Sequence, residues 1–418
     1  MTSPSSTGLK TDHDLGVTAP RGFRAGAAAA GIKASGKSDI GVLACDVEAP
    51  AAAVFTTNRV AGAPVLVSRE HLQSRDRRER LVRAVVVNSG CSNVCTGERG
   101  IADAREMAAL AARAIGCPAE AVLVASTGVI GRFLPMEKVR SGVAAACARL
   151  STGPEADRAF AEAILTTDTR LKQAGVRLSL GGRTVTIAGA TKGVGMIEPA
   201  MATTLSFLAT DAAAPSDLLQ AALGRTVDRT YNCLTIDGHQ STSDTMAILA
   251  SGRAMEGGPP IAAGSPDAAR FEAALEAVCG DLAYQIAADA EGGTKVIEVR
   301  VTGAASDTEA RRAARAIANS PLVKCAFFGE DPNWGRIISA AGNAGISSGP
   351  DSMRLRIGDL VIFERGRPAG ADPKQLKAAM HAHDIAVHLD LGAGRGEARY
   401  LTCDFSYDYV KINAEYTT

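Results

Sequence analysis

The chain has 418 residues, with Lys plus Arg and Asp plus Glu at 45 each, so its formal net charge at pH 7 is zero. This balance, together with only 4% aromatic residues, argues against a protein that coats nucleic acid or an anionic membrane. With 46% hydrophobic and 22% charged residues, the composition is globular, and the length corresponds to about two to three domains. No apolar run approaches the ~20 residues of a membrane span and the N-terminus lacks a secretion signal, so we expect a cytoplasmic protein.

Strand and helix signals alternate through the first half of the chain. Short β-branched runs predict strands over 83–87 and 121–125. Apolar and small residues at helical spacing predict helices over 101–115, 136–150 and 155–165. Gly181-Gly182 predicts a turn between two strand-like runs.

The second half opens with the strongest helix signal, in which Ser265 provides a cap and Pro266 occupies the first helical position. Before it, residues 252–264 are rich in Gly and Pro and are expected to form an exposed linker. Residues 294–301 alternate like a half-buried strand, and Gly358-Asp359 between two alternating runs predicts a hairpin over 353–363. The chain is therefore expected to be a mixed α/β protein in which layers of helices cover sheets.

The nine cysteines are scattered, and most lie in apolar sequence. Cys91 and Cys95 form the only close pair, and a metal site would need two further ligands at a recognisable spacing. The phosphate-binding loop and dinucleotide-binding fingerprints are also missing. We therefore expect structural thiols, no metal and no nucleotide cofactor.

The segment 191–211 combines a flexible cationic turn with a cluster of hydroxyl side chains. Lys192 precedes Gly193-Val194-Gly195, and Thr203-Thr204 precede an apolar strand over 205–208. One interpretation is a Gly-rich loop that leads into a core strand. The other is a threonine nucleophile, because a cut before Thr203 would create an α-amino group with a pKa of about 7.7–8.0 that acts as its base.

This segment, KGVGMIEPAMATTLSFLATDA, resembles the nucleophile segment of the ornithine acetyltransferase family, the glutamate N-acetyltransferases of arginine biosynthesis. Members of that family cut themselves before the Thr of an Ala-Thr pair. The resemblance implies cleavage between Ala202 and Thr203, with Thr203 as the nucleophile. The products would be an alpha chain, 1–202, and a beta chain, 203–418. Thr204 stands where the family usually has Met.

Further segments resemble the same family in order along the chain. The NSG and CTG motifs at 88–90 and 95–97 match, as does STGVIG at 126–131. The resemblance assigns Thr127 and Gly128 to an oxyanion hole, where a hydroxyl and a backbone N–H stabilise the negative charge that develops on a carbonyl oxygen. Without the resemblance, this segment would be read as a turn that ends a strand.

Three polar segments carry the implied substrate contacts. TTDT at 166–169 provides Thr166, with Thr167 as the alternative, although a Thr/Asp turn is the simpler interpretation. Lys192 offers one fixed cation for an α-carboxylate, and its simpler interpretation is a solvated surface lysine. EGGTK at 291–295 matches the family and implies that Glu291 is an active-site carboxylate.

The C-terminus and one loop complete the comparison. The tail DYVKINAEYTT matches the family, in which the corresponding Asn and final Thr hold the substrate, so Asn413 and Thr418 are implied contacts. The segment DGHQSTSDT departs from the family pattern at His239, Gln240 and Ser243. We interpret His239 as a loop residue, because no spacing supports a catalytic triad.

The resemblance implies an αββα sandwich like that of N-terminal-nucleophile proteins, with a smaller second lobe. It implies acetyl transfer from N-acetylornithine to glutamate through a Thr203 acyl-enzyme, without a cofactor, and two copies of each chain. Acetyl-CoA is a second donor in some family members, and the sequence leaves its use open. Two alternatives also stay open: an amide hydrolase or acyltransferase that acts on a secondary metabolite, and a paralogue without catalysis.

Overall fold

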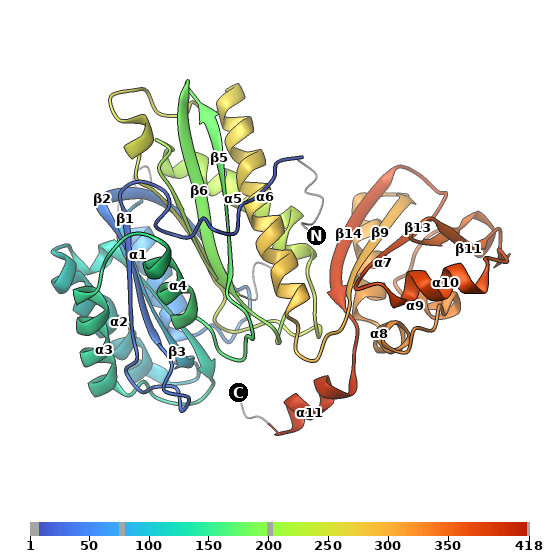
Figure 1. Ribbon diagram of the computed structural model, residues 1–418, viewed down its shortest axis with the longest axis horizontal. Helices are drawn as coiled ribbons and strands as arrows, with labels where there is room; N and C mark the ends of the chain where they lie inside the picture. Colours follow the sequence, from blue (N-terminus) through green and yellow to red (C-terminus); the bar gives the residue numbers. More distant parts are fainter. Residues whose placement is uncertain (1–7, 75–79, 199–203, 416–418) are drawn as a thin grey trace.

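The computed structural model describes residues 8–74, 80–198 and 204–415, which form a larger N-terminal lobe and a smaller C-terminal lobe (Figure 1). The larger lobe contains an eight-stranded sheet in the order β4-β3-β2-β8-β7-β6-β5, with β1 paired to β2. The strands are β1 (Phe23–Ala28), β2 (Ile40–Phe55), β3 (Leu81–Cys91), β4 (Val122–Val129), β5 (Lys172–Leu180), β6 (Arg183–Lys192), β7 (Leu205–Thr210) and β8 (Thr245–Ala250). The helices are α1 (Ala63–Ser74), α2 (Gly97–Ile115), α3 (Met136–Ala148), α4 (Pro154–Ala163), α5 (Ser216–Arg229) and α6 (Pro266–Ala288).

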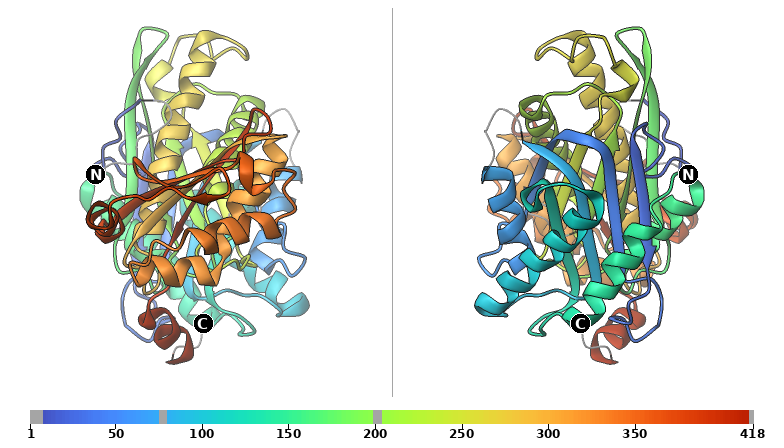
Figure 2. Two further views of the ribbon diagram at one scale, coloured as in Figure 1. Left: turned by 90° about the vertical axis from the view of Figure 1, so that its right-hand side faces the viewer. Right: turned by 90° about the vertical axis from the view of Figure 1, so that its left-hand side faces the viewer.

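The long strand β2 divides this sheet into two layers. Its first part, 40–44, pairs with β1 and β3, and its last part, 51–55, pairs with β8. One apolar core fills the space between the layers and includes Leu43, Val85 and Phe207. A second core lies under α2 and α3 on one outer face, and a third lies under α5 and α6 on the other. The expected αββα sandwich is therefore confirmed (Figures 1 and 2).

The smaller lobe is a six-stranded sheet in the order β12-β11-β10-β13-β9-β14. Its strands are β9 (Val296–Ala304), β10 (Arg354–Ile357), β11 (Leu360–Glu364), β12 (Arg367–Pro368), β13 (Asp384–Asp390) and β14 (Gly396–Cys403). Its helices are α7 (Asp307–Asn319), α8 (Pro321–Phe328), α9 (Trp334–Asn343) and α10 (Pro373–His381). After β14, the chain leaves this lobe and ends in α11 (Tyr407–Glu415), near the base of the larger lobe (Figure 1). Among the helices described, none is both long and apolar enough to span a bilayer.

Most of the predicted elements are confirmed within a few residues of their expected bounds. Ser265 caps α6, since its hydroxyl accepts a hydrogen bond from the Ala268 N–H at 3.1 Å. Gly181-Gly182 forms the β5–β6 turn, and Gly358-Asp359 separates β10 from β11. The expected exposed linker over 252–264 is only partly confirmed, because most of its residues are exposed but three of them are buried. Its residues Met255 and Ile261 are buried in the core beside α6, because apolar side chains between the glycines pack against that core.

Strand register brings distant parts of the chain to one edge of the sandwich. Lys192, the last residue of β6, pairs with Leu205, the first residue of β7, and Leu205 pairs in parallel with Thr245 of β8. In the other layer, β3 and β4 run parallel and align Gly90 with Gly128. The polar motifs at the ends of β3 and β4 therefore lie at the same edge as the polar residues at the end of β6 and the start of β7.

The core between the layers should dominate stability. Phe160 of α4 is fully buried and makes an edge-to-face contact with Phe207, with ring centroids 5.8 Å apart. Phe160→Ala is expected to lower the free energy of unfolding by about 3–5 kcal/mol, through lost transfer energy and a residual cavity. Urea unfolding followed by circular dichroism measures this change. The matched change at an exposed site, Leu322→Ala, should stay within about 0.5 kcal/mol, and equal losses would contradict the assignment of the core.

Candidate active site

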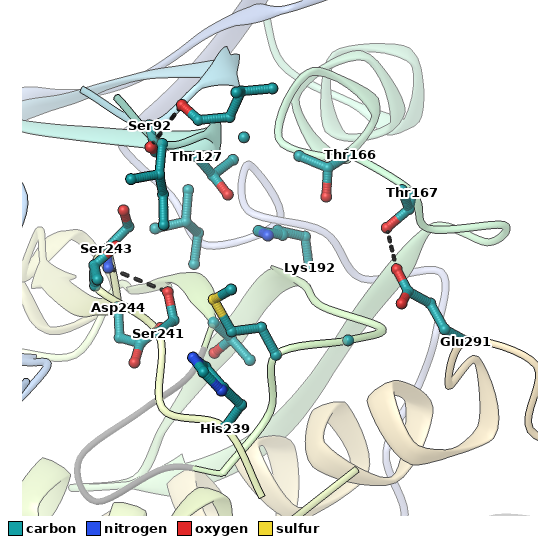
Figure 3. Close-up of a pocket in the computed structure, with 18 of the residues that line it drawn as sticks. Ser92, Thr127, Thr166, Thr167, Lys192, His239, Ser241, Ser243, Asp244 and Glu291 are labelled. Carbon is teal, nitrogen blue, oxygen red and sulfur yellow. Dashed lines mark hydrogen bonds between the residues drawn. The ribbon is translucent and has the colours of Figure 1, made fainter. Parts of the chain in front are cut away.

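A polar cavity of about 290 Å³ opens at the edge where the two layers meet (Figure 3). It collects residues that are far apart in the sequence, from β4, β6, the loop after α4, the loop before β8 and α11. The site residues expected from the sequence that line this cavity are Thr127, Gly128, Thr166, Thr167, Lys192, Glu291 and Asn413. Ala202, Thr203 and Thr418 lie outside the described residues. Thr204, which directly follows the proposed nucleophile in the sequence, lines the cavity.

The wall formed by β3 and β4 carries the expected oxyanion pair. Gly128 has φ of +123°, and a Cβ at this position would lie 2.5 Å from the carbonyl carbon of Gly90, so this place requires glycine. The Ser126 hydroxyl donates to Asn88 Oδ1 at 2.6 Å, and Asn88 Nδ2 donates to the Cys91 carbonyl at 2.9 Å. These bonds fix the two strand ends together and hold the neighbouring Thr127 at the cavity wall.

Three polar groups converge on the middle of the cavity. Figure 3 shows the hydroxyls of Thr127 and Thr166 turned toward the ammonium group of Lys192. Neither Thr127 Oγ1 nor Lys192 Nζ makes a hydrogen bond to another residue in the described parts of the chain. A hydroxyl and a cation in one space, neither bonded to another described residue, can stabilise a developing oxyanion and bind a carboxylate.

The electrostatics around Lys192 involve two buried acids. Burial lowers the pKa of Lys192, and the negative charges of Asp168 and Asp244 oppose that shift. Burial also raises the pKa of Asp244 well above its ordinary range, while Lys192 acts in the opposite direction. Asp244 is 1% exposed, and its Oδ2 has no hydrogen-bond partner within the described structure. The cavity therefore holds a cation and a carboxyl group whose protonation states depend on each other.

A second group of predicted residues meets at Glu291. Thr167 Oγ1 donates to Glu291 Oε1 at 2.8 Å, and Asn413 Nδ2 donates to Glu291 Oε2 at 3.3 Å. The Glu291 N–H donates to the Val194 carbonyl at 2.8 Å, which ties this carboxylate to the turn after Lys192. Because α11 supplies Asn413, the C-terminal segment takes part in the wall of the cavity. Thr166 and Thr167 differ in that only the Thr167 hydroxyl bonds to Glu291.

The positions that depart from the family pattern are not equivalent. His239 and Ser243 line the cavity, with His239 on an exposed part of the loop. Gln240 is not among the lining residues, and its side-chain amide donates to Thr57 Oγ1 at 2.7 Å. His239 and Ser243 are therefore the two departures that face the site.

Several lining residues were missed in the sequence, and three of them are Asp237, Asp244 and Tyr409. Asp237 accepts hydrogen bonds from the N–H groups of Met196 and Ile197 at 2.6 and 3.0 Å, and it thereby holds the loop that follows Lys192. Asp244 precedes the buried strand β8, and Tyr409 lies on α11. The sequence feature that could have identified Asp244 is its position directly before an apolar strand. No sequence feature marks Tyr409 as part of a site.

Thr204 is fixed in place by the sheet. It is 2% exposed, its carbonyl accepts from the Thr245 N–H at 3.0 Å, and its hydroxyl lies 3.2 Å from Ser206 Oγ. The Ser206 hydroxyl in turn donates to the buried Tyr231 hydroxyl at 3.0 Å. A chain of buried hydroxyls therefore anchors the residue that directly follows Thr203.

The larger lobe is an αββα sandwich whose two layers meet at an edge that holds a polar cavity, an architecture that suits an enzyme active site. The ArgJ family profile matches residues 24–418. The chain is 48% identical to the arginine biosynthesis bifunctional protein ArgJ of Symbiobacterium thermophilum, over 96% of this chain and 98% of that protein. It is 47% identical to the protein of the same name from Gloeobacter violaceus, over 97% and 98%. The chain belongs to the ArgJ family.

Two solved structures are also similar. The arginine biosynthesis bifunctional protein argJ of Bacillus halodurans is 42% identical, with a TM-score of 0.49 over 51% of this chain and 100% of that chain. The ornithine acetyltransferase of Mycobacterium tuberculosis, complexed with ornithine, is 39% identical, with a TM-score of 0.43 over 46% and 99%. The family identifies this chain as an acyltransferase of arginine biosynthesis with the glutamate N-acetyltransferase role, as the sequence predicted.

The close approach at Gly128 gives a direct test of the site. Gly128→Ala places a Cβ against the Gly90 backbone and should separate the ends of β3 and β4, with a loss of stability and of acetyl transfer. Gly131→Ala is the matched control, because its φ is +79° but no atom lies within 4 Å of the added Cβ. That control should cost only the left-handed backbone strain of about 1–2 kcal/mol. Chemical unfolding and turnover measure both variants, and equal effects would show that the contact with Gly90 is unimportant.

Proposed function

We propose that this cavity transfers an acetyl group from N-acetylornithine to glutamate through an acyl-enzyme on Thr203. The observation that supports this proposal most strongly is the convergence of Thr127, Gly128 and Lys192 on one cavity that Thr204 also lines. The groups needed for acyl transfer thus surround the end of the segment that carries the nucleophile. These residues are far apart in the sequence, so their convergence on one cavity supports a shared role in the reaction.

The proposed reaction has two half-reactions. The Thr203 Oγ attacks the acetyl carbonyl, and the α-amino group of Thr203 takes the hydroxyl proton. The tetrahedral intermediate places its negative oxygen toward the Thr127 hydroxyl and the Gly128 N–H. Collapse breaks the amide bond, and ornithine leaves with that proton on its nitrogen. The amino group of glutamate then attacks the acyl-enzyme by the reverse sequence, and Thr203 regains its proton.

Recognition of the amino-acid substrates follows the charges of the cavity. Lys192 binds the α-carboxylate that donor and acceptor share, and Thr166 hydrogen-bonds beside it. Glu291, held by Thr167 and Asn413, supplies negative charge at the other end of the site. Thr418 is proposed to complete the contacts from the C-terminus.

The active protein is proposed to form by self-cleavage between Ala202 and Thr203. The products, 1–202 and 203–418, stay together, with two copies of each in the assembly, in the cytoplasm. The relatives are named bifunctional, and we propose acetyl-CoA as a second acetyl donor at the same threonine. No resident metal or cofactor is required for this exchange.

Self-cleavage is tested by intact mass spectrometry. The purified protein should contain two chains, the second of which begins with Thr203. Thr203→Ala should remain a single chain, because the hydroxyl that attacks the upstream carbonyl is gone. A Thr203→Ala protein that still splits at this bond would exclude Thr203 as the nucleophile.

The oxyanion assignment predicts a specific kinetic defect. Thr127→Ala should lower kcat by roughly 10²–10³-fold, the usual effect of removing one oxyanion donor. The KM should change much less, since this contact strengthens only as charge develops. Steady-state kinetics with N-acetylornithine and glutamate measure both parameters. An unchanged kcat with a raised KM would instead make Thr127 a substrate-binding residue.

A further inference from the structure

A buried ion cluster lies directly behind the substrate-binding wall. Lys172, the first residue of β5, forms ion pairs with Asp168 at 2.7 Å and with Asp289 at 2.6 Å. The three side chains are 1%, 0% and 4% exposed. Because burying ionised groups costs free energy unless they are paired and hydrogen-bonded, such a cluster needs compensation from its neighbours.

Asp168 is bonded to both segments that carry the proposed carboxylate contacts. Its Oδ2 accepts from the Thr166 N–H at 3.1 Å. Its Oδ1 accepts from the Gly193 N–H at 2.7 Å, and Gly193 directly follows Lys192. One carboxylate therefore fixes the backbone at Thr166 and at Lys192 relative to each other.

Asp289 anchors the opposite side of the cluster. It accepts hydrogen bonds from the Thr169 side chain and backbone and from the Arg170 N–H. It lies at the C-terminal end of α6, two positions before Glu291. The cluster thus joins the loop after α4, the turn after β6 and the end of α6, three segments that carry or adjoin residues of the cavity wall.

Within the cluster the negative charges outnumber the positive ones, and the cations outside it whose charges interact with Asp168 are Lys192 and Lys33. Asp168 and Asp289 carry two negative charges, and Lys172 carries one positive charge. We propose that Asp168 is a positioning residue that divides its negative charge between Lys172 and Lys192, so that Lys192 stays protonated and aimed at the substrate carboxylate. This inference rests on the proposed role of Lys192 in binding that carboxylate.

The protonation equilibria agree with this geometry. Burial lowers the pKa of Lys192, and Asp168 is the strongest of the charges that oppose this shift. Burial disfavours ionisation of Asp168, but the charges of Lys172 and Lys192 keep its pKa below the ordinary value. The other groups that act on Lys192 are Asp244 before β8, Glu291 after α6, and Lys172 on β5, which lowers its pKa.

The experiment is the pH dependence of kcat/KM for N-acetylornithine, in variants with opposite expected shifts. Asp168→Asn removes the charge that stabilises the protonated form of Lys192, so the basic limb should move to lower pH by about one unit. A one-unit shift corresponds to roughly a tenfold rise in KM on that limb, with little change in kcat. The double variant Lys172→Met/Asp289→Asn removes one charge of each sign. Asp168 then loses the ion pair with Lys172, and its negative charge acts on Lys192 without that competing cation. Its basic limb should move to higher pH.

Controls separate this inference from the function on which it rests. Lys192→Met should raise KM and abolish the basic limb; if it changes neither, the proposed role of Lys192 fails. If Lys192→Met has that effect but Asp168→Asn leaves the limb in place, the role of Asp168 is overturned. Asp46→Asn makes the same charge change in an exposed ion pair with Arg24 and should shift nothing.

A purely structural cluster gives a different pattern. It would lower the melting temperature of Asp168→Asn and of the double variant without shifting the basic limb of the pH profile, or it would shift that limb in the same direction in both. Either result would overturn the proposal. Intact mass should show both chains in every variant, because each variant keeps the Thr203 hydroxyl that attacks the upstream carbonyl. The proposal requires opposite shifts in a processed protein.

Discussion

The site depends on the pairing of β2 with both layers of the sandwich. One part of this strand pairs with β1 and β3, and the other part pairs with β8. The apolar core between the layers holds them face to face. Because the two layers share this strand, the end of β4, with Thr127 and Gly128, lies opposite the ends of β6 and β7. A cavity with an oxyanion wall and a cationic wall follows from that constraint.

The same topology explains how a chain cut between β6 and β7 would stay assembled. In the sheet order, β8 and β7 lie between β2 on one side and β6 on the other. The proposed beta chain would therefore contribute two central strands, flanked on both sides by strands of the alpha chain. Backbone hydrogen bonds and the cores on both faces hold these strands in place independently of the peptide bond before Thr203. Cleavage can then release an α-amino group without separating the products.

Charge burial distinguishes the polar end of this sandwich from its core. Lys172, Asp168 and Asp289 are almost fully buried. Lys172 pairs with both carboxylates, which also accept hydrogen bonds from backbone N–H groups and from the Thr169 hydroxyl. Such a network is costly to bury and strongly directional once formed. It fixes the relative positions of three loops that apolar packing alone would leave less well defined. The proposed recognition of the substrate would therefore depend on groups that lie behind the cavity wall.

The sequence by itself determined much of this protein. Local patterns placed the main helices and strands, since capping at Ser265, alternation in 294–301 and glycine turns depend on neighbouring residues alone. The ordered motifs predicted the family, the sandwich and the candidate residues that line the cavity. At 252–264 composition indicated an exposed linker, and most residues are exposed, but it gave no sign that Met255 and Ile261 are buried.

Only the tertiary structure decided which polar groups meet. The pairing of Lys172 with Asp289 and the hydrogen bonds from Thr167 and Asn413 to Glu291 join residues from separate segments. Their spacing in the sequence carries no signal of these contacts. The physical reason is that helix and strand periodicities act over a few residues, whereas the positions of these groups depend on strand order, register and the packing of the two layers.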